Sequence, residues 1–129
     1  MNVPTDFDLE LEPNGTFAIL TNHRDVTLQS AIERQRAMRK FAEKHGVYNF
    51  LLDTRGKSFC GTYVDLFRFA RKTLHKEGFD SRWKVALVIS PQDRSHDMLE
   101  IFTNNAGYQV KIFADYDEAK VWLTWKSEV

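Results

Sequence analysis

Hydrophobic and acidic side chains alternate near the beginning of the chain. Phe7, Leu9 and Leu11 are separated by acidic residues, and this period of two is typical of a strand with one face in water. The Pro-Asn-Gly triplet at 13–15 predicts a tight turn. A second apolar strand at 16–21 follows it, so the sequence predicts an antiparallel hairpin that begins at Phe7 and ends with this strand.

A helical period replaces the alternation after residue 27. Thr27 is suited to cap the beginning of this helix and Gly46 to end it. Its basic residues are assigned to an outer face, which would either be solvated or lie against an acidic partner or anionic lipid heads. These residues are Arg34, Arg36, Arg39, Lys40 and Lys44.

A buried strand, a loop and an aromatic helix are predicted next. The apolar run 47–53 indicates a strand buried on both faces. The loop 54–61 follows, and Thr62 with Asp65 has the spacing of a capping box. The helix that it opens is predicted at 62–76.

Two further strands and two further helices are expected in the last third of the chain. Residues 85–90 form its most apolar run and predict a second buried strand. Ser95 is predicted to cap a third helix, and 110–113 to form the last strand. Asp115 with Glu118 is predicted to open the final helix.

The resulting order, ββαβαβαβα, predicts an α/β fold. We expect a mostly parallel central sheet with strands 47–53 and 85–90 in its middle, the N-terminal hairpin as an antiparallel edge, and about four helices. Ligands of such sheets normally bind at the carboxyl ends of the strands. The positions expected to be buried are Leu51, Val85, Leu87, Ile89, Phe102, Ile112 and Leu123.

Composition narrows the class of protein. At 129 residues and 43% hydrophobic content the chain fits one globular domain, 1–129. Lys and Arg balance Asp and Glu at 18 each, which gives no overall field toward nucleic acid. The single cysteine, the absence of a signal-like start and the absence of a membrane-spanning run lead us to expect a cytoplasmic protein without integral membrane association.

The C-terminal pattern resembles a known family. It follows V-x-x-F-x-D-x-x-E-A-x-x-W-L, and the strand at 83–88 is also similar to that family. The matching residues are Val110, Phe113, Asp115, Glu118, Ala119, Trp122 and Leu123. The family is the SpoIIAA-like, or STAS/SEC14-type, group of small bacterial proteins, so the resemblance implies a STAS-like fold. Lipids and other apolar ligands are among the uses suggested for that group.

The resemblance also points to one loop. Phosphorylatable STAS regulators carry Asp-Ser-Ser/Thr-Gly at the start of the helix after the central strand. This chain has Ser-Phe-Cys-Gly-Thr at 58–62, without the Asp-Ser pair. Thr62 and Ser58 are therefore the candidate phosphorylation positions that the resemblance implies.

Catalytic and metal-binding chemistry receives little support from the sequence. Cys60 precedes a helix N-terminus, which favours a thiolate, but among the histidines only His96 is expected at the same sheet edge. A small side chain packed into the loop is the simpler interpretation. Asp53 ends a central strand, as the phospho-accepting aspartate of a response-regulator receiver domain does. Such a domain also needs an acidic pair after its first strand and a lysine after its last, and both are missing here, so Asp53 is interpreted as capping the loop. No metal-ligand spacing and no cofactor motif are present, so we expect neither.

Helix 62–76 has more aromatic residues than one packed stripe requires, and the surplus is expected to line a pocket, meet a partner or fill the core.

Three candidate functions follow from these observations. The first is a non-catalytic regulatory or binding domain that contacts a protein partner through loop 55–62 and the following helix. The second is a carrier or sensor of an apolar, lipid-like small molecule near helix 62–76. The third is a Cys60-dependent enzyme, which ranks last. The candidate binding residues are Arg55, Lys57, Ser58, Phe59, Cys60, Thr62, Tyr63 and Phe67.

Overall fold

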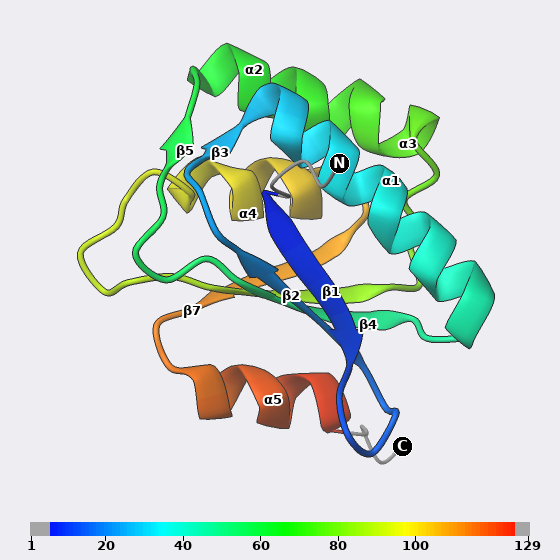
Figure 1. The fold of residues 1–129 in the computed structure, drawn as a ribbon. Helices are drawn as coiled ribbons and strands as arrows, with labels where there is room; N and C mark the ends of the chain where they lie inside the picture. Colours follow the sequence, from blue (N-terminus) through cyan, green and yellow to red (C-terminus); the bar gives the residue numbers. More distant parts are fainter. Residues whose placement is uncertain (1–5, 126–129) are drawn as a thin grey trace, which may run out of the picture.

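A five-stranded sheet forms the centre of the computed structural model, which describes residues 6–125 (Figure 1). The strand order is β1-β2-β4-β6-β7. Only the β1–β2 pair is antiparallel, and the other neighbours are parallel, as predicted. The strands are β1 (Phe7–Leu11), β2 (Ala18–Asn22), β4 (Asn49–Asp53), β6 (Lys84–Val88) and β7 (Gln109–Phe113).

Helices cover both faces of the sheet. Figure 1 shows α1, α2 to α3 and α4 on one face, and α5 alone on the other. A π-helical segment, η1, joins α2 to α3, so these three pieces form one of four helical segments in the part of the chain described. The bounds are α1 (Leu28–His45), α2 (Tyr63–Arg68), η1 (Phe69–Thr73), α3 (Leu74–Lys76), α4 (Asp97–Asn105) and α5 (Tyr116–Thr124).

The alternation of side chains along β4 and β6 divides the core in two. Phe50, Leu52, Val85 and Leu87 point into the larger cluster, beneath α1, α2 to α3 and α4. The intervening residues point the other way, into a smaller cluster with α5. That cluster consists of Phe17, Leu51, Ala86, Val88, Ala119 and Leu123.

Local capping rules describe four helix ends correctly. The Thr27 side chain accepts from the backbone of Ser30, and Gly46 ends α1 with φ of 65°, a left-handed conformation that suits glycine. Thr62 and Asp65 form the expected capping box. At α5 the Asp115 side chain accepts from the N–H of Glu118.

One pairing was missing from the predicted architecture. The segment expected to be only a loop contains a short strand, β5 (Phe59–Cys60), which pairs in parallel with β3 (Val26–Thr27). This second sheet brings the loop after β4 against the segment that precedes α1. The partners are more than 30 residues apart in sequence, so local periodicity does not reveal the pairing.

Three smaller expectations were wrong or displaced. The second hairpin strand begins at Ala18, two residues later than predicted. Ser95 does not cap α4, because α4 begins after His96 and has no side-chain cap there. Phe102 and Ile112 are only half-buried, while the other five positions expected in the core are buried. Ile112 lies on β7, an edge strand with a neighbour on one side only.

Candidate functional site

The candidate site begins where β4 ends. Asp53 accepts hydrogen bonds from the backbone N–H of Arg55 (3.2 Å) and from its guanidinium (2.9 and 2.7 Å). The guanidinium hydrogen bond holds the pKa of the Asp53 carboxyl below its usual value against the opposing effect of burial. Arg55 also lies over the Tyr116 ring, 4.9 Å from the centroid. Asp53 therefore organises the start of the loop, as the sequence indicated.

Side chains from three other segments hold the backbone of loop 55–62. The N–H of Gly56 donates to Ser90 Oγ at 2.8 Å, and that of Ser58 donates to Asp25 Oδ1 at 2.9 Å. The N–H of Phe59 donates to Ser95 Oγ at 2.9 Å. Because these partners come from outside the loop, its conformation is fixed by tertiary structure. Ser95 Oγ accepts this hydrogen bond from Phe59, which explains why Ser95 is not used as a helix cap.

The predicted binding residues gather on this loop and the first turns of α2, with different exposure. Lys57 and Phe59 are half-buried. The Phe59 ring folds back over Gly61, where an added Cβ would lie 2.6 Å from Phe59 Cε2. The exposed members are Arg55, Ser58, Cys60, Thr62, Tyr63 and Phe67.

Of the two candidate phosphorylation positions, Thr62 has the more constrained hydroxyl. Thr62 Oγ1 accepts from the N–H of Asp65 at 3.1 Å, and Asp65 Oδ2 accepts from the N–H of Thr62 at 3.1 Å. Both Thr62 and Ser58 are exposed. A phosphate on Thr62 would therefore act directly on the beginning of α2.

The surplus aromatic residues divide between the core and the surface. Phe69 is buried, as are Phe79 and Trp83, so these three belong to the core. Tyr63 and Phe67 have exposed fractions of 66% and 49%.

Val64 has an exposed fraction of 58%. Val64 and Tyr63 precede Phe67 by three and four residues, so both are its helical neighbours. We call these three side chains the α2 patch. Its inner edge is supported by an edge-to-face contact between the rings of Phe67 and Phe102, 5.4 Å apart. The α2 patch is thus an exposed apolar surface that is held in place by packing against Phe102.

Cys60 is exposed, whereas the histidine at this edge is buried. His96 is 1% exposed, and its Nδ1 lies 3.3 Å from Asp93 Oδ2. Its ring neighbours that of Phe59, at a centroid distance of 6.5 Å. Within residues 6–125 no hydrogen bond joins a histidine to Cys60, so the structure does not assemble the nucleophile and base that a thiol enzyme needs.

A buried polar group lies deeper in the fold, and the sequence assignment of Arg34 was wrong. Arg34 was placed on the basic outer face of the first helix, but it is only 6% exposed, and Gln35 beside it is also buried. Burial lowers the pKa of Arg34 to about 10. The burial of Arg34 could have been predicted from its spacing in the sequence. It stands three residues after Ala31 and four before Met38, which places it on the apolar stripe of the helix.

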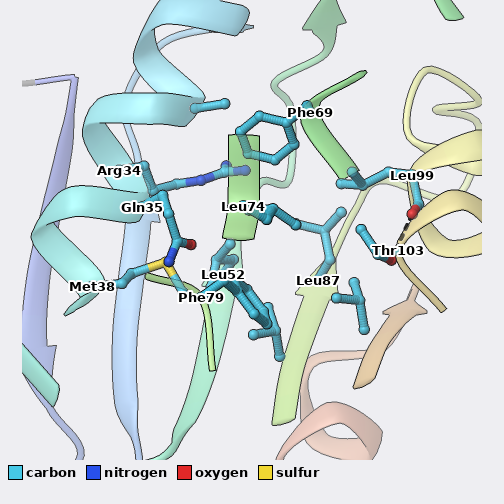
Figure 2. Close-up of a pocket in the computed structure, with 13 residues that line it drawn as sticks. Arg34, Gln35, Met38, Leu52, Phe69, Leu74, Phe79, Leu87, Leu99 and Thr103 are labelled. Carbon is cyan, nitrogen blue, oxygen red and sulfur yellow. Dashed lines mark hydrogen bonds between the residues drawn. The ribbon is translucent and has the colours of Figure 1, made fainter. Parts of the chain in front are cut away.

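Arg34 and Gln35 line a cavity of about 30 Å³ between α1, the helix that follows loop 55–62, and the sheet (Figure 2). Its remaining walls are almost entirely apolar. They include Phe69 and Leu74, so this is a cavity beside helix 62–76, where the apolar-ligand hypothesis expected one. Drug-sized ligands need roughly 300–1,000 Å³, and the cavity in this conformation admits only something far smaller.

Charge is segregated over the molecule despite the neutral total. Segments 28–46 and 63–77 carry nine Lys and Arg against four Asp and Glu, and the rest of the chain carries nine against fourteen. The two segments lie side by side, joined by an ion pair of 2.7 Å between Arg36 and Glu77 (Figure 1). Four of the basic residues assigned to the outer face of α1 are exposed, and these are Arg36, Arg39, Lys40 and Lys44.

Neither a membrane-spanning helix nor a cluster of metal ligands is found within residues 6–125. None of the helices within 6–125 has the length and apolar character needed to cross a membrane. Over the same residues, no group of three or more metal-ligating side chains is assembled.

Comparison with known proteins identifies the fold. No family model matches the chain, and no curated protein matches it. Among solved structures it is similar to an uncharacterised protein of the DUF3478 family with a SpoIIAA-like fold, from Shewanella loihica PV-4. The TM-score is 0.56 at 18% identity, and the match covers 91% of each chain. The chain therefore has a SpoIIAA-like fold, as the C-terminal pattern implied.

Proposed function

We propose that the chain is a non-catalytic binding domain that contacts a protein partner through loop 55–62 and the α2 patch. The observation that carries the proposal is the exposure of three neighbouring apolar side chains, Tyr63, Val64 and Phe67, on a helix whose inner side already fills the core. Apolar burial contributes about 25 cal/mol per Å². Contiguous exposed apolar surface of this kind commonly marks an interaction site.

The rigidity of the loop supports the same proposal. Hydrogen bonds that its N–H groups donate to Ser90, Asp25 and Ser95 fix its backbone before any partner arrives. A surface that is already ordered loses less conformational entropy on association, so more of the contact energy appears as affinity.

The surrounding charges indicate the chemistry of the partner. Arg68, Arg71 and Lys72 are exposed on the helical segment that begins with the α2 patch. A partner with acidic groups around an apolar pocket would complement them, and the charges would increase the rate of encounter. We favour a protein over a lipid surface because the apolar side chains adjoin a loop of fixed hydrogen-bonding groups, which suits directional recognition.

Phosphorylation of Thr62 is the regulation that we attach to this proposal, with Ser58 as the second position. Phosphorylation of Thr62 would esterify the oxygen that accepts from Asp65 N–H and would place negative charge between the N-terminus of α2, which attracts it, and the Asp65 carboxylate, which repels it. The capping box would be rearranged, and the α2 patch that follows it would change its geometry.

Site-specific photo-crosslinking tests the proposal. Benzoylphenylalanine replaces Phe67 in one variant and Val121 in another, in cells that naturally produce the chain. Val121 is a matched control, because it is 64% exposed on α5, on the opposite face of the sheet. We expect one discrete protein adduct from position 67, lost when Tyr63→Ser is added, and none from position 121.

Two results would overturn the protein-contact proposal. One is the same set of adducts from both positions, which would show only random encounters. The other is a lipid adduct alone from position 67, which would assign the α2 patch to a membrane surface.

A further inference from the structure

We propose that the cavity behind α1 is a binding site for a small organic anion of the size of formate or acetate, with its carboxylate on Arg34. This inference does not depend on the protein contact proposed above, because Tyr63, Val64 and Phe67 do not line the cavity. It rests on three observations: an unpaired buried charge, the polarity of the cavity wall and the size of the space.

The first observation is a buried cation without a partner. Arg34 is 94% buried, and its Nη1 has no hydrogen-bond acceptor within residues 6–125. In that part of the chain no carboxylate forms an ion pair with its guanidinium, whereas Arg36, two residues later, is paired with Glu77. An isolated charge in an apolar interior is strongly unfavourable. A bound anion would supply the missing countercharge.

The second observation is the arrangement of polar groups on the cavity wall. Figure 2 shows Arg34 and Gln35 extending from α1 into a space otherwise walled by apolar side chains. The Nε2 of Gln35 is also buried without an acceptor. The remaining polar residue of the wall, Thr103, donates its hydroxyl to the carbonyl of Leu99 at 2.6 Å. The fully buried atoms left unpaired in the wall, Arg34 Nη1 and Gln35 Nε2, are therefore both on N–H donors.

Two donors on one wall, one of them a cation, suit a carboxylate. The guanidinium fork binds two carboxylate oxygens in one plane, and Gln35 adds a second polar side chain to the same wall. A water molecule could accept from the same groups but would leave the positive charge uncompensated. The chemistry of the wall therefore selects an anion.

The third observation is the volume of the space. A water-sized group needs at least about 10–15 Å³ of such space, so about 30 Å³ holds the equivalent of two or three water-sized groups. Formate and acetate are of this size, because their bonded atoms lie closer together than separate water molecules do. Phe69, Leu74 and Leu99 bound the space with apolar surface. A carboxylate with at most a very short apolar tail fits these limits, while a long acyl chain does not.

The wall itself contains an irregular element. Phe69 is the first residue of the π-helical segment η1, and Leu74 follows its last residue. Both residues line the cavity. Single π-helical turns within α-helices frequently occur at functional sites, and this one lies against the unpaired charge.

Acetate titration of the intact chain tests the site. The ¹⁵N–¹H resonances of the Arg34 Nε–H and the Gln35 side-chain amide are followed by NMR at constant ionic strength, with sodium formate and sodium chloride in parallel titrations. We expect saturable shifts of both signals with acetate or formate. In Arg34→Met the Gln35 shift should require at least about tenfold more acetate, as expected for losing a charged hydrogen bond.

Lys40→Met is the matched control, because it removes one exposed positive charge from the same helix. It should leave the acetate response unchanged. Arg34→Lys keeps the charge without the fork and should bind acetate more weakly than the unmodified chain. Circular dichroism of each variant confirms that it is folded.

Three outcomes would overturn the inference. The first is the absence of any saturable shift with acetate or formate in the unmodified chain. The second is an unchanged acetate response in folded Arg34→Met. The third is saturation by chloride at the same concentration as acetate, which would show that the cavity does not select a carboxylate.

Discussion

The two faces of the sheet are packed in different ways. On the α5 face, Leu51, Ala86 and Val88 meet an apolar helix stripe, and polar groups at its end are paired. Asn49 Nδ2 donates to the carbonyl of Leu123 at 3.0 Å, and Lys84 Nζ donates to that of Trp122 at 3.2 Å. All of the buried polar atoms found without a partner in the described chain lie on the other face. They belong to Arg34, Gln35, Asp93 and His96.

This difference separates stability from function. The α5 face resembles an ordinary core, in which apolar contact and satisfied polar groups stabilise the fold. The α1 to α4 face combines a cavity, an unpaired cation and exposed aromatic residues, none of which stabilises the isolated chain. Features of that kind are expected where a molecule interacts with something else.

The largest expected effect compares one deleted leucine on each face. Leu51→Ala and Leu87→Ala should each lower the free energy of unfolding by about 2–5 kcal/mol, measured by urea denaturation. Leu51 is completely buried against the α5 cluster, whereas Leu87 borders the existing cavity. Water entering the enlarged cavity could reach Arg34 and Gln35, so Leu87→Ala should cost less. A larger loss for Leu87→Ala would contradict the contrast between the faces.

Removing the buried cation should raise stability. In buffer without small carboxylates, Arg34→Met should increase the free energy of unfolding by about 1–4 kcal/mol, the gain seen when buried charges are replaced by apolar side chains. Lys40→Met should stay within about 0.5 kcal/mol of the original chain. A destabilised Arg34→Met would show that Arg34 is already compensated in the folded state.

The helix caps test whether the two faces loosen separately. Thr62→Ala and Asp115→Ala each remove an N-cap acceptor, of α2 and α5 respectively. Each should cost about 0.5–2 kcal/mol. Amide hydrogen exchange should then increase in α2 for Thr62→Ala and in α5 for Asp115→Ala. Equal exchange changes in both helices from either variant would mean that the faces unfold together.

Mild acid should weaken the α1 to α4 face through His96. Burial holds the pKa of His96 below its ordinary value of 6.5, with Arg34 acting in the same direction and Asp93 and Asp97 opposing it. Because the unfolded chain binds the proton first, stability should fall as the pH drops below about 6.5. His96→Gln should reduce this dependence, measured as denaturation midpoints from pH 7.5 to 5.5. His75→Gln, at an exposed position, should leave it unchanged.

The smallest effect on stability is expected at the α2 patch. Tyr63→Ala should change the free energy of unfolding by about 0.5 kcal/mol or less, as is usual for exposed positions. Phe67→Ala should cost about 0.5–1.5 kcal/mol, because it also loses the edge-to-face contact with Phe102. Thermal denaturation measures this directly. A loss comparable with that of Leu87→Ala would place these side chains in the stabilising core and remove the basis for a contact surface.

The elements that follow from neighbouring residues were predictable from the sequence. Thr27, Thr62 and Asp115 cap helices because their side chains reach N–H groups three residues later. The strands in the middle of the sheet were found because both of their faces are apolar. Loop 55–62 stays a predicted site, chosen from its place after β4 and from the aromatic residues that follow it.

The rest depends on contacts between distant segments. The β3–β5 pairing and the use of Ser95 by Phe59 join residues that are about 33 to 36 positions apart. Arg34 was misplaced because its charge was given more weight than its position on the apolar stripe. Hydropathy alone assigns arginine to the surface, and only the full packing of α1 against the sheet shows that this side chain is almost entirely buried.

The segregation of charge gives the neutral molecule a permanent electric dipole, with its positive pole over α1 and the segment from α2 to α3. A distant field exerts no net pull on such a molecule, but it does exert a torque. Close to an acidic surface the chain would therefore rotate before it touches, and collisions would begin with the positive pole foremost. Orientation, rather than attraction over a long range, is what this charge pattern contributes to an encounter.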